Sequence, residues 1–204
     1  FATLGEKKFL RFWADRLWDR PRFYFFPMSQ QPHSDLIRAE AHRLGFEFVG
    51  FAKAERLDEA ARRLESWLAQ GAHGSMNYMA HHFDMRVDPT LLVPGAKTLI
   101  CLTFNYHNPE KQRDPEAPRI SQYAYGEDYH FVVKDRLKSL LAYMREHIGE
   151  IDGRCFVDSA PVLEREWAQR AGLGWNGRHT LTIHPRRGSY FFLAEIICDL
   201  PLVY

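Results

Sequence analysis

One aspartate stands where a strand-like run gives way to a helix-like one. A short buried strand is indicated by Cys155, Phe156 and Val157, and Asp158 follows directly. In α/β proteins such a junction commonly brings ligands and catalytic groups together. A proton-donating carboxylic acid needs its pKa raised by burial, whereas a helix N-terminus stabilises the ionised form. Asp158 is therefore either a proton donor or a cap of the following helix.

A second stretch combines basic and aromatic side chains. It contains Arg165, Arg170, Arg178, Arg186 and Arg187, interleaved with Trp167, Trp175, His179 and Tyr190. Arginine side chains pair with phosphates, and aromatic faces can stack on bases. The pattern is typical of a local RNA-binding patch, and a solvated basic face is the alternative.

A glycine-rich string follows the helix-like run. Gly172, Gly174 and Gly177 match the dinucleotide-binding pattern G-x-G-x-x-G, but here a helix precedes the glycines and a strand follows, the reverse of the order that this site requires. We expect these glycines to end the helix and to allow a close backbone approach.

The histidine and cysteine patterns do not predict a metal site in this chain. Asp128-Tyr129-His130 opens the D-x-H-x-x-G pattern by which some cobalamin proteins supply a histidine to cobalt, but Val133 stands at the last position. The three cysteines, Cys101, Cys155 and Cys198, are far apart, so neither a disulfide framework nor a clustered metal site is indicated. A reducing cytoplasm is the expected location.

Composition limits the classes of protein to which the chain can belong. Of 204 residues, 46% are hydrophobic and 14% aromatic, and the formal net charge is +1. This composition predicts a globular protein with a sizeable core and excludes a strongly basic nucleic-acid coat. Since no apolar run approaches the ~18 to 20 residues of a membrane span, we expect no membrane association.

The elements that must position these residues alternate between helices and strands. Helical spacing of apolar residues predicts helices over 34–44 and 58–70 and a longer one around 132–144, and strands are predicted over 46–51 and 98–104. After Asp158 we expect a helix that Ser159 caps, with Pro161 in its first turn and Gly172 at its end.

The last predicted element is a β-hairpin. Its strands are 180–184 and 189–197, and its turn is Pro185-Arg186-Arg187-Gly188. The expected fold is therefore α+β (mixed α/β layers), with a central mixed sheet that is flanked by helices and ends in this hairpin. Residues 1–27 are aromatic-rich and basic, and we interpret them as a leader of doubtful function before a domain over 28–204.

Several strings resemble the epoxyqueuosine reductase family. They are VDSAPVLER (157–165), AGLGW (171–175), GSYFFLAE (188–195), GSMNYM (74–79), RVDP (86–89), PGAK (94–97), ISQYA (120–124) and GEDYH (126–130). They extend over most of residues 28–204, in the order that the family has. This family reduces epoxyqueuosine to queuosine in the anticodon wobble position of tRNA, the last step of queuosine biosynthesis, with cobalamin and iron–sulfur clusters.

The resemblance implies roles for individual residues. By position, Asp158 is similar to the family's proton donor over the cobalt face. It also implies a corrinoid site lined by Arg86, Ser121, Asp158, Thr182, His184, Ser189 and Leu193, with Arg165 toward the tRNA. The incomplete Asp128-x-His130 pattern fits base-off cob(II)alamin without a protein histidine on cobalt.

The chain departs from the family pattern in places. Gln122 and Glu127 stand where the family usually has arginine, and residues 174–180 read GWNGRHT where the family typically has GWIGKNT. The family's cysteine-rich, ferredoxin-like part should follow the last strand, and its cluster cysteines are absent from this sequence. We therefore expect a cobalamin-binding catalytic domain that needs the iron–sulfur part for turnover.

Three functions remain open from the sequence. The first is an epoxyqueuosine reductase domain, a cytoplasmic monomer that acts on tRNA with an external electron donor. The second is a flavin- or corrinoid-dependent reductase of a small molecule. The third is a noncatalytic cobalamin-binding module.

Overall fold

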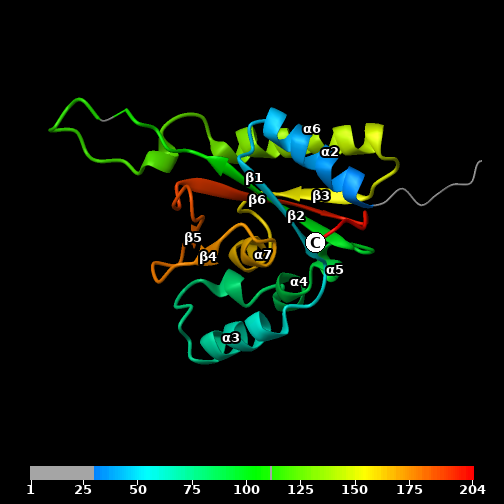
Figure 1. The fold of residues 1–204 in the computed structure, drawn as a ribbon. Helices are drawn as coiled ribbons and strands as arrows, with labels where there is room; N and C mark the ends of the chain where they lie inside the picture. The colour runs from blue at the N-terminus through cyan, green and yellow to red at the C-terminus, as the bar shows by residue number, and fades with distance from the viewer. Residues whose placement is uncertain (1–29, 111) are drawn as a thin grey trace, which may run out of the picture.

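A computed structural model describes residues 30–110 and 112–204 and shows helices on both faces of an antiparallel sheet (Figure 1). The expectations for the leader, residues 1–27, lie outside the described residues. In the part described, no helix is both long and apolar enough to span a bilayer.

Four strands form the central sheet, in the order β1-β2-β6-β3. Their bounds are β1 (Phe48–Lys53), β2 (Thr98–Asn105), β3 (Gly153–Phe156) and β6 (Phe191–Cys198). All three pairings are antiparallel, with Cys101 of β2 opposite Glu195 of β6 and Glu195 opposite Phe156 of β3. The last strand in the chain is therefore interior to the sheet.

One face of the sheet is covered by α2 (Gln30–Arg43) and α6 (Tyr129–His147). The predicted stripe of α6 is buried at Val133, Leu137, Leu140, Leu141 and Met144, because residues three and four apart share a helix face. Asp128 begins this helix, since its carboxylate accepts the backbone N–H of His130. These helices and the sheet enclose the largest apolar cluster of the described residues.

The opposite face holds α7 (Glu164–Arg170), whose Trp167 and Ala168 are fully buried. This helix lies so close to β1 that a Cβ on Gly50 would come within 2.1 Å of the Ala171 carbonyl oxygen. A second layer on this side comprises α3 (Asp58–Ala69), α4 (Phe83–Val87), α5 (Pro89–Leu92), β4 (Trp175–Asn176) and β5 (Thr182–Ile183), with the short 3-10 turn η1 (Asn77–Met79). A second 3-10 turn, η2 (Gln122–Ala124), precedes α6.

The α+β class is confirmed, but two details of the prediction are wrong. The sheet is antiparallel throughout rather than mixed, and β5 and β6 do not form a hairpin. β5 pairs with β4 in a separate two-stranded sheet, while β6 pairs with β2 and β3. Of the expected hairpin only the bridge between His184 and Gly188 exists, because β5 pairs with the nearby β4 and β6 pairs with β2 and β3.

The segment after β3 also differs from the prediction. Residues 158–163 form a loop, and α7 begins at Glu164 rather than at Ser159. Neither Asp158 nor Ser159 caps the helix; its cap position is Leu163, which makes no side-chain cap hydrogen bond. The expected end at Gly172 is confirmed, since this glycine follows α7 with a φ of +75°.

Candidate functional site

A cavity of about 1330 Å³ lies on the α7 side of the sheet. This volume exceeds the ~300 to 1,000 Å³ of most small-ligand pockets. Six residues that the sequence singled out line it: Arg86, Asp158, Arg165, Thr182, Ser189 and Leu193. They come from α4, the loop after β3, α7, β5, the turn before β6 and β6 itself, so the fold assembles them from segments far apart in the sequence.

Two expected site residues, Ser121 and His184, are not among the residues that line this cavity. Ser121 precedes η2. The His184 ring stacks on Phe48, with centroids 3.6 Å apart, and its Nδ1 accepts the Arg186 backbone N–H at 3.3 Å. Burial and the positive charge of Arg186 lower the His184 pKa. In this structure His184 therefore shapes the turn beside the cavity.

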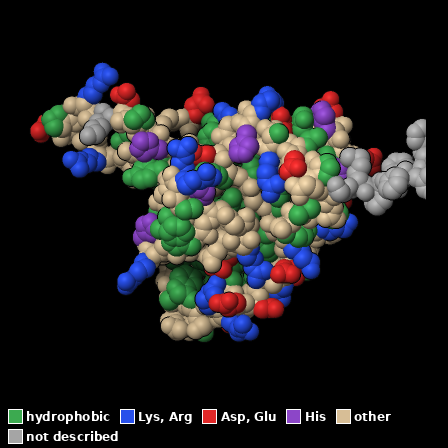
Figure 2. All heavy atoms as spheres, in the orientation of Figure 1, with side chains coloured by type: hydrophobic (Ala, Val, Ile, Leu, Met, Phe, Trp, Pro, Cys, Tyr) green, Lys and Arg blue, Asp and Glu red, His purple; other side chains and the backbone are tan. Residues whose placement is uncertain are grey.

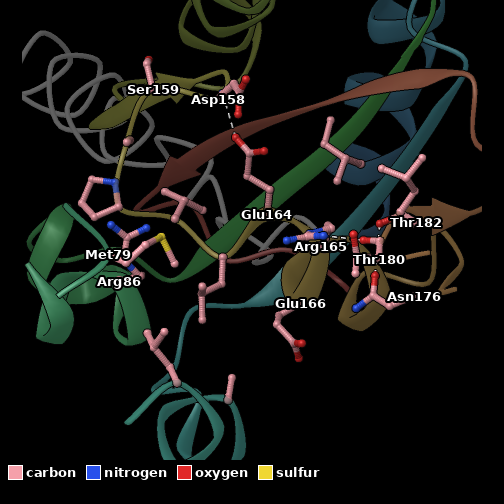
Figure 3. Close-up of a pocket in the computed structure, with 18 of the residues that line it drawn as sticks. Met79, Arg86, Asp158, Ser159, Glu164, Arg165, Glu166, Asn176, Thr180 and Thr182 are labelled. Atoms are coloured by element: carbon pink, nitrogen blue, oxygen red, sulfur yellow. Dashed lines mark hydrogen bonds between the residues drawn. The ribbon is translucent and has the colours of Figure 1, made fainter. Parts of the chain in front are cut away.

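Asp158 projects from the loop between β3 and α7. Its backbone is left-handed, with a φ of +50°, a conformation that aspartate tolerates better than most side chains. The backbone N–H donates to Glu164 Oε1 at 2.7 Å, as Figure 3 shows. Its carboxylate is more than half exposed and accepts the Tyr129 hydroxyl at 2.6 Å. The loop thus presents an accessible carboxyl group to the cavity.

Tyr129 is a site residue that the sequence reasoning missed. It lines the cavity, and its ring stacks on Phe192 with centroids 4.0 Å apart and planes 7° from parallel. Burial raises the pKa of Tyr129, and the hydrogen bond to Asp158 raises it further. The Tyr129 hydroxyl therefore stays protonated near neutral pH. It orients Asp158 by donating a hydrogen bond to the Asp158 carboxylate. Tyr129 is part of the Asp128-Tyr129-His130 string, but that string was interpreted only through His130 as a possible cobalt ligand.

Two glutamates lie close to Asp158. Glu164 lines the cavity and points toward Asp158 (Figure 3), and burial raises its pKa to about 7. Glu195 on β6 is fully buried, and neither of its carboxyl oxygens has a hydrogen-bond partner in the described part of the chain. Burial raises the pKa of Glu195 well above its ordinary value, and the charges of Glu164 and Asp158 add to this shift. Both glutamates belong to quoted motifs, yet their burial was invisible in the sequence.

Arg86 lines the cavity from α4, beside Met79 (Figure 3). Its Nη2 donates to the Tyr78 carbonyl oxygen at 3.2 Å. Its Nε is buried and makes no hydrogen bond to any described residue. Desolvation lowers the Arg86 pKa, but the guanidinium group remains positively charged. A buried donor without a protein partner at a cavity wall is available to an acceptor in the cavity, either water or a ligand.

The remaining wall comes from the glycine-rich segment and β5. Arg165 Nη1 donates to the Thr180 carbonyl oxygen, and Thr182 Oγ1 donates to Asn176 Oδ1 at 3.2 Å. A Cβ on Gly174 would lie 2.1 Å from the Ile183 carbonyl oxygen, so this position requires glycine. The expected close backbone approach is confirmed.

Among the described residues, no group of three or more His, Cys, Asp or Glu side chains is arranged to hold a metal ion. The chemistry available from the side chains is acid–base chemistry and hydrogen bonding. The cavity thus combines an accessible carboxyl, two proton-holding glutamates behind it and an unpaired guanidinium donor.

Comparison with known proteins shows the family of this chain. The family model "Epoxyqueuosine reductase QueG, DUF1730" matches residues 86–159. The epoxyqueuosine reductase of Cyclobacterium marinum is 52% identical over 176 residues, which cover 85% of this chain and 56% of that protein. The epoxyqueuosine reductase of Vibrio cholerae is 43% identical over 180 residues, which cover 86% of this chain and 48% of that protein. The chain thus spans about half the length of these curated relatives.

Solved structures show the same fold. The epoxyqueuosine reductase of Streptococcus thermophilus superposes with a TM-score of 0.77 at 27% identity, covering 83% of this chain and 46% of that one. Another epoxyqueuosine reductase, crystallised with an epoxyqueuosine-modified tRNA stem loop, gives a TM-score of 0.72 at 26% identity, with the same coverage. A reductive dehalogenase described for B12-dependent dehalogenation shares the fold alone, with a TM-score of 0.50 at 15% identity. On the strength of its sequence relatives and its fold, this chain belongs to the epoxyqueuosine reductase family.

Proposed function

We propose that this chain is the cobalamin-binding, proton-donating domain of an enzyme that reduces epoxyqueuosine to queuosine in tRNA. The observation that carries the proposal is the position of Asp158, an accessible carboxyl held by Tyr129 and Glu164 at the wall of the large cavity. A relative crystallised with an epoxyqueuosine-modified tRNA stem loop supports the substrate class.

The cavity fits a corrinoid. Its volume of about 1330 Å³ suits a ligand larger than a typical nucleotide or drug. Leu193, Phe191 and Met79 supply apolar wall for a ring face, and Ser189 and Thr182 supply hydroxyls for amide arms. The unpaired Arg86 Nε is a donor that a corrinoid amide carbonyl would satisfy. Bound cobalamin would deliver the reducing electrons, which no side chain here can donate.

The side chains have the tasks of orientation, desolvation and proton transfer. Tyr129 donates to the Asp158 carboxyl and fixes its direction, and the Asp158 carboxylic acid would protonate the epoxide oxygen as its C–O bond opens. Electron delivery to the cofactor would come from iron–sulfur clusters and an external donor outside this sequence, in line with the family resemblance.

Contact with tRNA would be local. Figure 2 shows side chains of both charges scattered over one face of the molecule rather than one continuous basic surface, as the net charge of +1 also suggests. Arg165 lines the cavity from α7 and is placed to meet a phosphate near the entrance. A binding mode with few phosphate contacts predicts a shallow dependence of affinity on salt.

The experiment that tests the cofactor is reconstitution with cob(II)alamin, followed by gel filtration and by visible and electron paramagnetic resonance spectra. We expect the cofactor to be retained with a base-off signal. A matched chain with Arg62→Gln, an exposed arginine outside the cavity, should retain it equally. If a folded chain of the relatives' full length returned free of cobalamin, the proposal would be overturned.

A second measurement separates the tRNA enzyme from the two alternatives. Epoxyqueuosine-modified and unmodified stem loops are titrated at several salt concentrations, with and without cobalamin. Tighter binding of the modified stem loop supports a tRNA reductase. Binding of cobalamin without any stem-loop affinity would favour a small-molecule reductase or a noncatalytic module.

A further inference from the structure

The buried carboxyl of Glu195 needs an explanation that packing does not provide. It lies on β6 between Cys101 on one neighbouring strand and Phe156 on the other. The side chain is 0% exposed, and both of its oxygens lack a hydrogen-bond partner among the described residues. An apolar side chain of similar size would pack there without this desolvation cost. A position that tolerates such a cost is a candidate for a functional group.

The environment of Glu195 raises its pKa well above the ordinary glutamate value. Burial disfavours its ionised form, and the nearby charges of Glu164 and Asp158 disfavour it further. Burial also raises the pKa of the Cys101 thiol, which lies opposite Glu195 on β2. The protonated form of Glu195 is thus favoured at this fully buried position of the sheet.

Glu164 connects this interior group with the cavity. Its Oε1 accepts the Asp158 N–H, so its carboxyl is fixed beside the Asp158 loop. Burial and the Asp158 charge raise its pKa, while the Asp158 N–H, Arg165 and His130 lower it, and the balance lies at about 7. Two carboxyls that interact in this way titrate as a pair rather than singly.

Reduction of an epoxide to an alkene needs more than one proton. Both C–O bonds break, a C=C bond forms and the oxygen leaves as water, which consumes two electrons and two protons. The electrons come from the reduced cofactor of the proposed function. Asp158 can give one proton to the oxygen, and the leaving hydroxyl then needs a second one within the same turnover.

We propose that Glu164 and Glu195 form a shared proton reserve that reloads Asp158 during the reaction. After Asp158 has protonated the epoxide oxygen, the Glu164–Glu195 pair loses one O–H proton and the Asp158 carboxylate gains it. Asp158 then donates this proton to the leaving hydroxyl, and solvent restores the pair once the product has left. This inference deepens the proposed function and rests on it.

The first test needs neither cofactor nor substrate. In the chain labelled with ¹³Cδ-glutamate, NMR over a pH series should show one glutamate that stays protonated well above neutrality and one that titrates near pH 7. Glu195→Gln should remove the first signal and Glu164→Gln the second. If every glutamate is ionised at pH 7, the reserve does not exist.

The second test uses a chain of the relatives' full length and single-turnover reduction of modified tRNA. Glu164→Gln keeps a carbonyl acceptor for the Asp158 N–H, and we expect it to lower the rate at least about tenfold and to abolish the fall in rate above pH 7. Glu195→Gln should move the midpoint of that fall by about one unit. Glu40→Gln, a buried glutamate on the opposite face paired with Arg43, is the matched control and should leave rate and profile unchanged. A wild-type pH profile in both Glu164→Gln and Glu195→Gln would overturn the proposal.

The two tests separate this inference from the proposed function. If the wild-type enzyme reduces the substrate but the NMR series shows no protonated glutamate, only the reserve fails. If the protonated glutamates are present but the full-length enzyme has no reductase activity, the proposed function fails, and with it the role in reloading Asp158.

Discussion

The two faces of the central sheet differ in whether their buried glutamate has a hydrogen-bond partner. On the α2–α6 face, the apolar cluster is continuous, and its buried Glu40 is paired with Arg43 through two hydrogen bonds of 2.6 and 2.7 Å. On the α7 face, the apolar cluster adjoins the cavity, and buried Glu195 has no partner in the described chain. The comparison teaches that the α2–α6 face pairs its buried carboxylate, whereas the α7 face, as far as the chain is described, keeps an unpaired one beside the cavity, where we propose binding and proton transfer.

The largest expected effect concerns the α7 face. In a chain of the relatives' full length, Asp158→Asn should lower single-turnover reduction by about 10²- to 10⁴-fold, because the general acid is lost. Asparagine tolerates the left-handed backbone, so stability should change little. The rate is followed by chromatography of digested tRNA, with cobalamin retention as the control for folding. Activity within a few-fold of wild type would remove Asp158 from the role of proton donor.

The next effect concerns the α2–α6 face. Leu137 on α6 is 0% exposed, and Leu137→Ala should lower the free energy of unfolding by about 2 to 5 kcal/mol in urea titrations. Leu181→Ala is the matched control, since Leu181 lines the cavity and is 46% exposed. It should cost less than about 0.5 kcal/mol. Equal decreases in the free energy of unfolding for Leu137→Ala and Leu181→Ala would contradict the view that the α2–α6 face contributes more to stability than the cavity wall does.

A smaller effect is expected for Arg86. If its buried Nε donates to the bound cofactor, Arg86→Gln should weaken cobalamin binding by about 1.5 to 3 kcal/mol, roughly ten- to hundredfold. Binding is measured by spectrophotometric titration, with Arg62→Gln as the exposed control. Unchanged affinity would show that the unpaired donor serves another purpose.

The smallest expected effect is on the pH dependence of stability, and it distinguishes the two buried glutamates, Glu195 and Glu40. The raised pKa of Glu195 means that the folded state resists its ionisation, so wild-type stability should fall as pH rises above the ordinary glutamate pKa of 4.5, by at most about 1.4 kcal/mol per unit. Glu195→Gln should flatten this decline.

Glu40 should behave in the opposite way. Its pKa is lowered, chiefly by the hydrogen bond from Arg43, so its contribution is present above the ordinary glutamate pKa and lost as pH falls. Glu40→Gln should therefore lower stability at pH 7 and have little effect in acid. Urea titrations at pH 4, 5, 6, 7 and 8 measure both slopes, and slopes of the same sign would refute the comparison.

The sequence predicted the elements that follow from local periodicity. The α6 stripe was correct, since 3.6-residue spacing directly reports a buried helix face. The helix start at Ser159 and the final hairpin were wrong. Pro161 and Ser159 are good helix-start residues, but Asp158 turns left-handed and Glu164 holds the loop. β5 pairs instead with the nearby β4 across residues 177–181, and β6 pairs with the distant β2 and with β3. The turn motif at 185–188 does not report these competing partners.

The candidate site was predicted in part for a similar reason. The strings that resemble the family identified cavity residues such as Arg86, Asp158 and Ser189. Glu195 was visible only as one letter in an apolar strand. Whether a glutamate in such a strand has a partner depends on which strands flank it, and that is a property of the assembled sheet.

The position of β6 bears on how the molecule folds. β6 is the last strand in the chain and pairs with β2, about ninety residues earlier, as well as with β3. Such distant pairing slows folding because a long loop must close before the contacts are gained. During synthesis, β2 would keep an open edge until residues 191–198 emerge from the ribosome. The nascent chain is therefore exposed to aggregation while the residues between β2 and β6 are made, and a folding helper that covers the β2 edge would raise its yield.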